Sequence, residues 1–458
     1  MDGRSKQLVP GTQRDSVEAM LPAGMGKNWK DFWKRQNVIP SIRKTIRWWA
    51  LSAAVGATVG TLVALFLFGL DRVTEVHWQY PWLLYLLPVA GAISAWMFTL
   101  SGRGADRGNN LILEEIHEQR SGVPMRMAPL VLLGTWLTHL FGGSAGREGT
   151  AVQMGAAIAA GVGRWLRLSR EETRSLLLCG VAAGFGSVFG TPVAGAIFAV
   201  EFLVNGRLAS RPILPCLIAS IVGDQVTLLW GIQHTQYVIT LDPSIALGLP
   251  VTVGAKVVLA SVCFGAASVL FAKATHLVQD YSKRWIAMNW LRPFIGGLAI
   301  IALVQLLGTR DYLGLGVSAP HGNPNAVTIQ SAFQEDGAEP PSWLFKLLFT
   351  AITVGSGFKG GEVTPLFFIG ATLGHVLGDA LGLPTGWMAG LGLVAVFSGA
   401  TKTPVASTFV AIELFLPHGE GLTQSGFVVY AAIACFVAYA VSGPTSIYHA
   451  QRHHSEVG

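Results

Sequence analysis

The chain carries few charged side chains and few cysteines for its length. Of its 458 residues, 13% are Asp, Glu, Lys or Arg, and only four are Cys. Soluble domains carry about 25% charged residues, so this composition argues against a soluble enzyme or binding domain. The cysteines are scattered through apolar segments without paired spacing, which argues against a disulfide framework and against cysteine metal ligands. We expect neither a cofactor nor a metal site.

Apolar sequence fills most of the chain instead. Hydrophobic residues make up 51% of it, and long apolar segments recur, for example at 48–70, 82–100 and 251–274. About 20 apolar residues let an α-helix cross the hydrocarbon layer of a bilayer. Alternating strands of roughly ten residues are absent, which argues against an outer-membrane barrel. The sequence therefore predicts an all-α polytopic membrane protein.

Glycine and proline interrupt many of these apolar segments. The chain has 55 Gly and 22 Pro. Backbone that is broken at membrane depth persists only where protein buries it or where it lines a cavity. We therefore expect many tilted and partial helices rather than a set of complete spans.

The first 47 residues have a different character from the rest. They carry ten Lys or Arg against four Asp or Glu. A basic segment next to an apolar span is typical of the cytoplasmic side of a membrane, and this interpretation is favoured over nucleic-acid binding. We predict a basic cytoplasmic N-terminal segment (1–47), two membrane halves (48–232 and 233–449) and a short C-terminal tail (450–458).

An internal repeat supports the division into two halves. Thr-Pro-Val-Ala, followed by a run that ends in Glu, occurs at 191–201 and again at 403–413, 212 residues later. In each copy the proline fits the first helical turn behind a threonine cap. We interpret the motif as packing that holds the halves together, with Glu201 and Glu413 capped or at the interface. The order of elements upstream matches too, since 146–157 resembles 361–372.

Two glycine-rich breaks carry charged residues. The first is Gly146-Arg147-Glu148-Gly149-Thr150, and the second, about 214 residues later, is Gly361-Glu362-Val363-Thr364-Pro365. Ionisable groups inside a membrane are expensive and usually mark ion or proton pathways. Matching polar breaks in the two halves of a transporter indicate its binding site.

A helix that begins at such a break can attract an anion. Its first backbone N–H groups are free and its dipole is positive at that end. Glu148, placed there, would occupy the anion's position when it is charged and leave it when it is protonated, so that one side chain exchanges an anion for a proton. The alternative is that the glycine-rich breaks only interrupt helices and bind no ion.

Other interpretations of these residues are weaker. The first break lacks the lysine of a phosphate loop, which argues against nucleotide binding. The sequence shows no set of nucleophilic or metal-binding residues that a membrane-embedded enzyme would need. Asp224 and Asp379 have no obvious partner in the sequence and are expected at helix ends.

The motifs resemble those of the CLC family of anion channels and proton-coupled antiporters. The resemblance rests on Gly146-Arg147-Glu148-Gly149 and on the run 182–201, and covers nearly all of 45–450. It implies about eighteen partly broken helices in two inverted repeats, a homodimer, and one pore in each protomer. It also implies that Glu148 is the gating glutamate and that Tyr448 is the tyrosine that coordinates the anion.

Where the chain departs from the common family motifs, its sequence resembles that of the fluoride-exporting bacterial clade. Thr150 replaces a proline, Arg107-Gly108-Asn109-Asn110-Leu111 replaces Gly-Ser-Gly-Ile-Pro, and 361–365 is acidic. Phe202 stands where chloride/proton antiporters commonly have an internal proton-transfer glutamate. Asn109, Asn110 and Arg107 compete for the central position of the first motif, and a helix cap is the alternative role for the two asparagines.

These substitutions make chemical sense for fluoride, a small, strongly hydrated anion that needs closely placed donors. Asn109, Thr364 and Tyr448 can supply donors, and Glu362 offers a second proton carrier. We include Gly146, Arg147, Gly149, Thr150 and Val363 in the binding region.

We therefore expect a proton-coupled fluoride exporter, a fluoride/proton antiporter of the inner membrane, working as a homodimer among membrane lipids and without nucleic acid. The closest alternative is a CLC-type chloride/proton antiporter or a voltage-gated chloride channel, for which chloride would be the partner ion.

Overall fold

The structure is a computed structural model, and it describes residues 38–101, 104–118, 122–203, 212–239, 250–320, 323–415 and 425–451. Most of the predicted N-terminal segment and the tail beyond residue 451 lie outside this range. By its internal contacts the chain divides into two units, Met1–Leu51 and Ser52–Gly458, and the contacts described below belong to the second.

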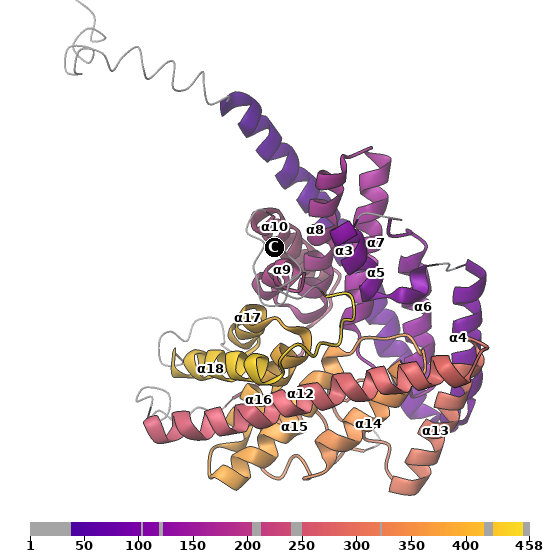
Figure 1. The fold of residues 1–458 in the computed structure, drawn as a ribbon, viewed down its shortest axis with the longest axis vertical. Coiled ribbons are helices and arrows are strands. Elements are labelled where there is room, and N and C mark those ends of the chain that lie inside the picture. Colours follow the sequence, from indigo (N-terminus) through magenta and orange to yellow (C-terminus); the bar gives the residue numbers. More distant parts are fainter. Residues whose placement is uncertain are drawn as a thin grey trace, which may run out of the picture. The chain divides into compact units, whose positions relative to one another are not determined.

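The described residues are almost entirely helical, as the sequence predicts. They form fifteen α-helices: α3 (Val38–Gln79), α4 (Leu87–Ser101), α5 (Asn109–Glu118), α6 (Met127–Leu140), α7 (Glu148–Trp165), α8 (Arg170–Phe189), α9 (Pro192–Glu201), α10 (Ile213–Leu229), α12 (Val251–Trp285), α13 (Leu291–Leu307), α14 (Ser342–Gly355), α15 (Val363–Leu381), α16 (Thr385–Thr401), α17 (Pro404–Phe415) and α18 (Ser425–Val441). Short 3-10 helices are η1 (Pro81–Leu86), η2 (Ala105–Arg107) and η3 (Ser331–Phe333). The long α12 runs across α16 and α18 (Figure 1).

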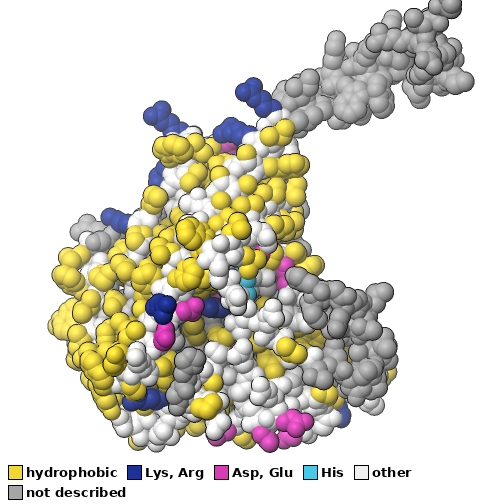
Figure 2. Space-filling model, turned by 180° about the vertical axis from the view of Figure 1, so that it is seen from behind, with side chains coloured by type: hydrophobic (Ala, Val, Ile, Leu, Met, Phe, Trp, Pro, Cys, Tyr) yellow, Lys and Arg dark blue, Asp and Glu magenta, His cyan; other side chains and the backbone are white. Residues whose placement is uncertain are grey.

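Helix length and surface composition agree with a membrane protein. Among the described residues, four helical stretches are long and apolar enough to cross a bilayer: Arg43–Gln79, Pro81–Leu100, Val251–Trp285 and Val363–Leu381. Many large apolar side chains are exposed, among them Trp96, Leu259 and Leu306. Figure 2 shows hydrophobic side chains over much of one face of the molecule. Apolar surface on this scale suits contact with lipid and would be a liability in water.

Matching glycine contacts pack the helices of each half. A Cβ built on Gly155 of α7 would lie 2.1 Å from the carbonyl oxygen of Gly180 of α8. In the second half, a Cβ on Gly370 of α15 would lie 2.2 Å from the carbonyl oxygen of Gly392 of α16. Small residues let membrane helices approach closely. The same contact at equivalent positions confirms the repeat that the sequence predicts.

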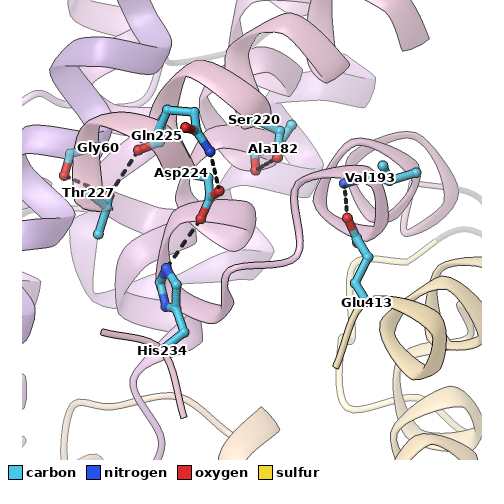
Figure 3. Close-up of polar contacts among 10 residues, drawn as sticks. Gly60, Ala182, Val193, Ser220, Asp224, Gln225, Thr227, His234 and Glu413 are labelled. Atoms are coloured by element: carbon cyan, nitrogen blue, oxygen red, sulfur yellow. Dashed lines mark hydrogen bonds and ion pairs between the residues drawn. The ribbon is translucent and has the colours of Figure 1, made fainter. Parts of the chain in front are cut away.

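The repeated Thr-Pro-Val-Ala motif joins the halves in a way that the sequence only partly predicts. Glu413 at the end of α17 accepts hydrogen bonds from the backbone N–H groups of Val193 and Ala194 at the start of α9, at 2.9 and 2.7 Å (Figure 3). Glu201 accepts reciprocally from Val405 and Ala406, at 3.0 and 2.7 Å. Each half therefore caps a helix of the other, which confirms the packing interpretation.

The expected threonine caps were wrong. Thr191 holds the N-cap position of α9 but makes no side-chain cap hydrogen bond. Thr403 pairs with the hydroxyl of Thr401 at 2.6 Å. The reason is that the glutamate of the opposite half already occupies the free N–H groups that a threonine hydroxyl would have capped.

Asp224 also differs from expectation, while Asp379 does not. Asp224 lies inside α10 rather than at its end, and its carboxylate is 3.2 Å from Nε2 of His234 (Figure 3). Asp379 lies in the last turn of α15, as predicted.

Candidate functional site

The two glycine-rich breaks meet each other. Gly146 and Gly361 exchange two backbone hydrogen bonds, each 2.6 Å long, in an antiparallel bridge. Helix α7 begins at Glu148, directly after the first break, and α15 begins at Val363, directly after the second. A Cβ built on Gly361 would lie 2.8 Å from the backbone nitrogen of Gly149, so glycine is required for this approach. The N-terminal ends of one helix from each half therefore converge.

Glu148 lies at this convergence and is fully buried. Its Oε2 accepts hydrogen bonds from the backbone N–H groups of Thr364, at 3.0 Å, and Arg147, at 3.1 Å. The hydroxyl of Thr364 donates to Oε1. Nε of Arg147 is 3.8 Å from Oε1. The carboxylate therefore occupies the N-terminal end of α15, a position in which free N–H groups and the helix dipole favour an anion.

Of the three candidates in the first motif, Asn109 is the one that lies at the breaks. Its Nδ2 would be 3.4 Å from a Cβ on Gly149, and its buried Oδ1 has no hydrogen-bond partner among the described residues. Asn110 instead accepts a hydrogen bond from the backbone N–H of Ala450, at 3.0 Å. Arg107 pairs with Glu114.

A cavity of about 600 Å³ brings four of the predicted residues together. Asn109, Thr150, Glu362 and Tyr448 all line it. Glu362 is half-buried on the wall and holds the N-cap position of α15 without a side-chain cap hydrogen bond. The hydroxyl of Thr150 is 2.6 Å from that of Thr135 on α6, so it is already engaged beside the cavity. Arg147 lies on a different cavity, of about 810 Å³.

Tyr448 lines the first cavity and contacts an aromatic side chain beside it. It is 6% exposed, and its ring meets that of Phe202 edge to face at a centroid distance of 6.0 Å. Phe202 stacks in turn on Phe198, at 5.1 Å. An apolar ring therefore fills the position at which the family resemblance places a proton-transfer glutamate.

Several supporting residues carried no signal in the sequence. Ser144, two residues before the first break, donates its N–H to the hydroxyl of Thr353 at 3.2 Å. Its own hydroxyl is 2.9 Å from that of Thr350, and both threonines lie on α14 of the second half. The ring of His139 bridges the carbonyl oxygens of Thr135 and Ala145. These contacts join residues up to about 200 positions apart, and only the fold reveals such pairs.

The described residues contain no cluster of three or more His, Cys, Asp or Glu side chains that could hold a metal ion.

Comparisons with known proteins agree with this architecture. The family model described as voltage gated chloride channel matches residues 90–443. A chloride/fluoride channel protein of Pseudomonas syringae pv. tomato is 47% identical over 416 residues, which cover 91% of this chain and 88% of the relative.

Solved structures give the same picture. The crystal structure of a CLC-type fluoride/proton antiporter is 34% identical, with a TM-score of 0.82, over 89% of this chain and 98% of that one. A slow cyanobacterial chloride/proton antiporter is 20% identical, with a TM-score of 0.72, over 88% and 96%, and that likeness concerns the fold alone. By sequence and by structure, the chain belongs to the CLC family of voltage-gated chloride channels and anion/proton antiporters.

Proposed function

We propose that the protein is a proton-coupled fluoride exporter. The observation that carries this proposal is the position of Glu148, whose carboxylate takes two hydrogen bonds from Thr364 at the start of α15. Fluoride and a carboxylate cannot occupy this position at once. When fluoride enters, Glu148 leaves, and it leaves at least cost when it is protonated. Each fluoride movement is thereby linked to a proton.

The donors around this position support fluoride rather than chloride. The N–H and the hydroxyl of Thr364 already donate to the two oxygens of the Glu148 carboxylate, and the amide of Asn109 lies close to Gly149. Fluoride is a strong acceptor with a tightly held hydration shell, so several short hydrogen bonds are needed to replace that shell. Among the relatives above, the fluoride/proton antiporter supports the same choice, and the name of the chloride/fluoride channel protein covers both anions.

Glu362 has the placement of a second proton carrier. It lines the cavity that also contains Asn109 and Tyr448, and it directly precedes Val363 at the start of α15. A charged carboxylate there would repel an arriving anion, so its protonated form accompanies fluoride. Tyr448 faces the same cavity and supplies a hydroxyl donor. Gly146, Arg147, Gly149 and Thr150 shape the site through the backbone contacts of the first break.

The buried Phe202 separates this proposal from the chloride/proton alternative. Its packing between Phe198, on which it stacks, and Tyr448, which it meets edge to face, leaves an apolar path where an internal carboxylate would carry protons. The same observation favours a passive chloride channel as the second candidate, because a channel needs no such carboxylate.

We further propose the setting in which the protein works. The basic segment 1–47 is cytoplasmic by the positive-inside rule, the membrane is the inner membrane, and the protein is a homodimer with a separate pathway in each subunit. The two membrane halves are 48–232 and 233–449.

Ion selectivity tests the proposal. The purified protein is reconstituted into proteoliposomes, and initial efflux rates of fluoride and chloride are compared at equal concentrations. We expect fluoride efflux to exceed chloride efflux by at least tenfold. Equal rates, or faster chloride efflux, would replace the fluoride assignment with the chloride one.

A further inference from the structure

Two cavities lie at opposite ends of a pair of packed helices, α4 and α13. The cavity of about 600 Å³ is lined by Phe98 near the end of α4 and by Arg292 near the start of α13. The cavity of about 810 Å³ is lined by Gln79, shortly before α4, and by Asp311, shortly after α13. Because α13 has 17 residues, the ends of the two linings at Arg292 and Asp311 lie roughly 25 Å apart, whereas near the first break the linings approach within one helical turn, at Arg147 and Thr150.

The candidate site lies between these cavities. Glu148 is buried, and its two neighbours in the site face different ways. Arg147 lines the larger cavity, whereas Glu362 lines the smaller one. Each cavity therefore reaches a residue next to the buried Glu148 site.

The two linings carry opposite charge. The described lining of the smaller cavity includes four Lys or Arg and two acidic residues, and we call it the basic vestibule; its charged residues are Arg107, Lys283, Arg292, Lys359, Asp106 and Glu362. The described lining of the larger cavity includes three acidic residues and one cation, and we call it the acidic vestibule; its charged residues are Asp71, Glu75, Asp311 and Arg147.

Of the cations in the basic vestibule, Lys359 is the nearest in sequence to the second break, two residues before Gly361. Its Nζ lies 4.3 Å from the ring centroid of Phe98 and 3.4 Å from the backbone carbonyl oxygen of Asp106. Its stem packs on Gly134, where a Cβ would be 2.8 Å from Cγ of Lys359. The ring and the carbonyl hold the ammonium in place, and the nearby carboxylate of Asp106 offsets part of its charge.

The other cations of the basic vestibule are partly engaged. Arg107 is paired with Glu114, and Arg292 donates Nε to the carbonyl oxygen of Ile286, at 2.8 Å. Lys283 is exposed at the end of α12. In the acidic vestibule, Asp311 accepts hydrogen bonds from Asn323 and Val327, which holds the loop after α13. Asp71 and Arg147 line the acidic vestibule together, and their opposite charges attract each other.

We propose that this charge asymmetry sets how readily fluoride reaches the site from each side, while the proton gradient sets the direction of net transport. The basic vestibule, with Lys359 as its principal cation, concentrates fluoride beside the site, and the acidic vestibule, through Asp71, repels fluoride and concentrates protons. The proposal rests on the proposed function. With the orientation proposed above, Gln79 ends the first span outside the cytoplasm, so the basic vestibule faces the cytoplasm. A fluoride exporter then gains a ready supply of fluoride from within and little return from outside.

The physical basis is focusing of the electrostatic field in a cavity with low-dielectric walls. Such cavities raise the local concentration of an ion of opposite charge by about tenfold or more at low ionic strength. The effect weakens as salt rises, because the screening length falls from about 30 Å at 0.01 M to about 8 Å at 0.15 M. The salt dependence therefore distinguishes this role from a direct contact with bound fluoride.

The test measures initial fluoride efflux from proteoliposomes against internal fluoride concentration, at low and at high concentrations of an inert salt. We expect Lys359→Gln to raise the KM for fluoride about threefold or more at low salt with kcat unchanged, and the difference to vanish at high salt. Lys359→Arg should keep the wild-type KM. Lys273→Gln removes the same charge from an exposed position of α12 that lines neither vestibule, and should change nothing.

Removal of a carboxylate from the acidic vestibule should change the KM for fluoride in the opposite direction. Asp71→Asn should lower the KM for external fluoride, measured as fluoride uptake at low salt, whereas Glu335→Gln, at an exposed carboxylate that lines neither vestibule, should not. If Lys359→Gln fails to fold, Lys283→Gln at the rim of the basic vestibule replaces it, with a smaller rise in KM expected.

The outcomes separate this proposal from the proposed function. Wild-type protein that transports fluoride with protons, together with charge variants that keep the wild-type KM at low salt, would overturn the vestibule proposal alone. A KM change that persists at high salt would also overturn it, because it would indicate direct contact with fluoride. Wild-type protein that moves no fluoride would overturn the proposed function itself.

Discussion

The carboxylate of Glu148 accepts hydrogen bonds from both the backbone N–H and the side-chain hydroxyl of Thr364, a residue of the opposite half of the chain. The contact places a negative charge at the N-terminal end of a helix that a bound anion would also use. Because the carboxylate is fully buried, its departure from this position is the step that would open the site. The predictions below follow from this contact and from the packing that maintains it.

Glu148→Gln removes the exchangeable proton but keeps the shape of the side chain. We expect fluoride movement that is no longer coupled to protons, because the amide has no titrating carboxyl group to carry them. Proton uptake is recorded with a pH electrode during fluoride efflux from proteoliposomes. Asp379→Asn, at an exposed carboxylate in the last turn of α15, is the control and should keep normal coupling. Fluoride efflux that still moves protons normally in Glu148→Gln would refute the role of Glu148.

Thr364→Val removes one of the two donors that Thr364 offers. Hydrogen bonds to charged groups contribute about 1.5–3 kcal/mol, so fluoride turnover should fall at least tenfold. Thr364→Ser keeps the hydroxyl and should retain most of the activity. Turnover is measured as initial fluoride efflux per protein. Wild-type turnover in the valine variant would show that this hydroxyl does not bind the transported ion.

Gly361→Ala tests the contact between the two breaks. The added Cβ would lie 2.8 Å from the backbone nitrogen of Gly149, and backbone cannot yield as a flexible side chain would. Overpacking of this kind costs about 1–3 kcal/mol, so we expect a lower thermal stability in detergent and a loss of transport. In Gly254→Ala, a Cβ meets only Tyr430 at 3.9 Å, so that variant should remain active. An active, equally stable Gly361→Ala protein would contradict the close contact.

Glu201→Ala and Glu413→Ala test the reciprocal caps. Each variant leaves two N–H groups at a helix start without their acceptor, and each lost charge-assisted hydrogen bond is worth about 1.5–3 kcal/mol. We expect both to unfold at lower temperature, by similar amounts, when monitored by thermal denaturation in detergent. Glu171→Ala, at an exposed position near the start of α8, should have a much smaller effect. Unchanged unfolding temperatures would mean that the caps do not hold the halves together.

Much of the fold could be predicted because the same sequence motifs occur in both halves of the chain. The two breaks and the two Thr-Pro-Val-Ala runs recur at nearly one spacing, so each copy supports the interpretation of the other. Apolar length and glycine content then indicate broken membrane helices. The family resemblance adds Glu148 and Tyr448, and the position of Asn109 beside Gly149 agrees with its choice over Asn110 and Arg107.

The partners of these residues could not be predicted in the same way. Glu201 caps a helix that begins some 200 residues later, and a threonine directly before a proline looks like the nearer cap. Asp224 gains a partner only because the chain returns His234 to it after α10 ends. Lys359 looks like one more loop lysine until Phe98 and the vestibule surround it. Such contacts depend on tertiary packing, on which local sequence patterns carry little information.

The direction of fluoride movement under an imposed pH gradient tests proton-coupled fluoride antiport most directly. Proteoliposomes start with equal fluoride on both sides, and potassium with valinomycin holds the membrane potential at zero. Protons that run from the acidic to the alkaline side should drive fluoride uphill toward the acidic side. Passive diffusion of hydrogen fluoride would carry it the other way, because a weak acid accumulates as its anion on the alkaline side. Fluoride accumulation on the acidic side, absent without protein, is the expected result, and no such accumulation by active wild-type protein would contradict antiport.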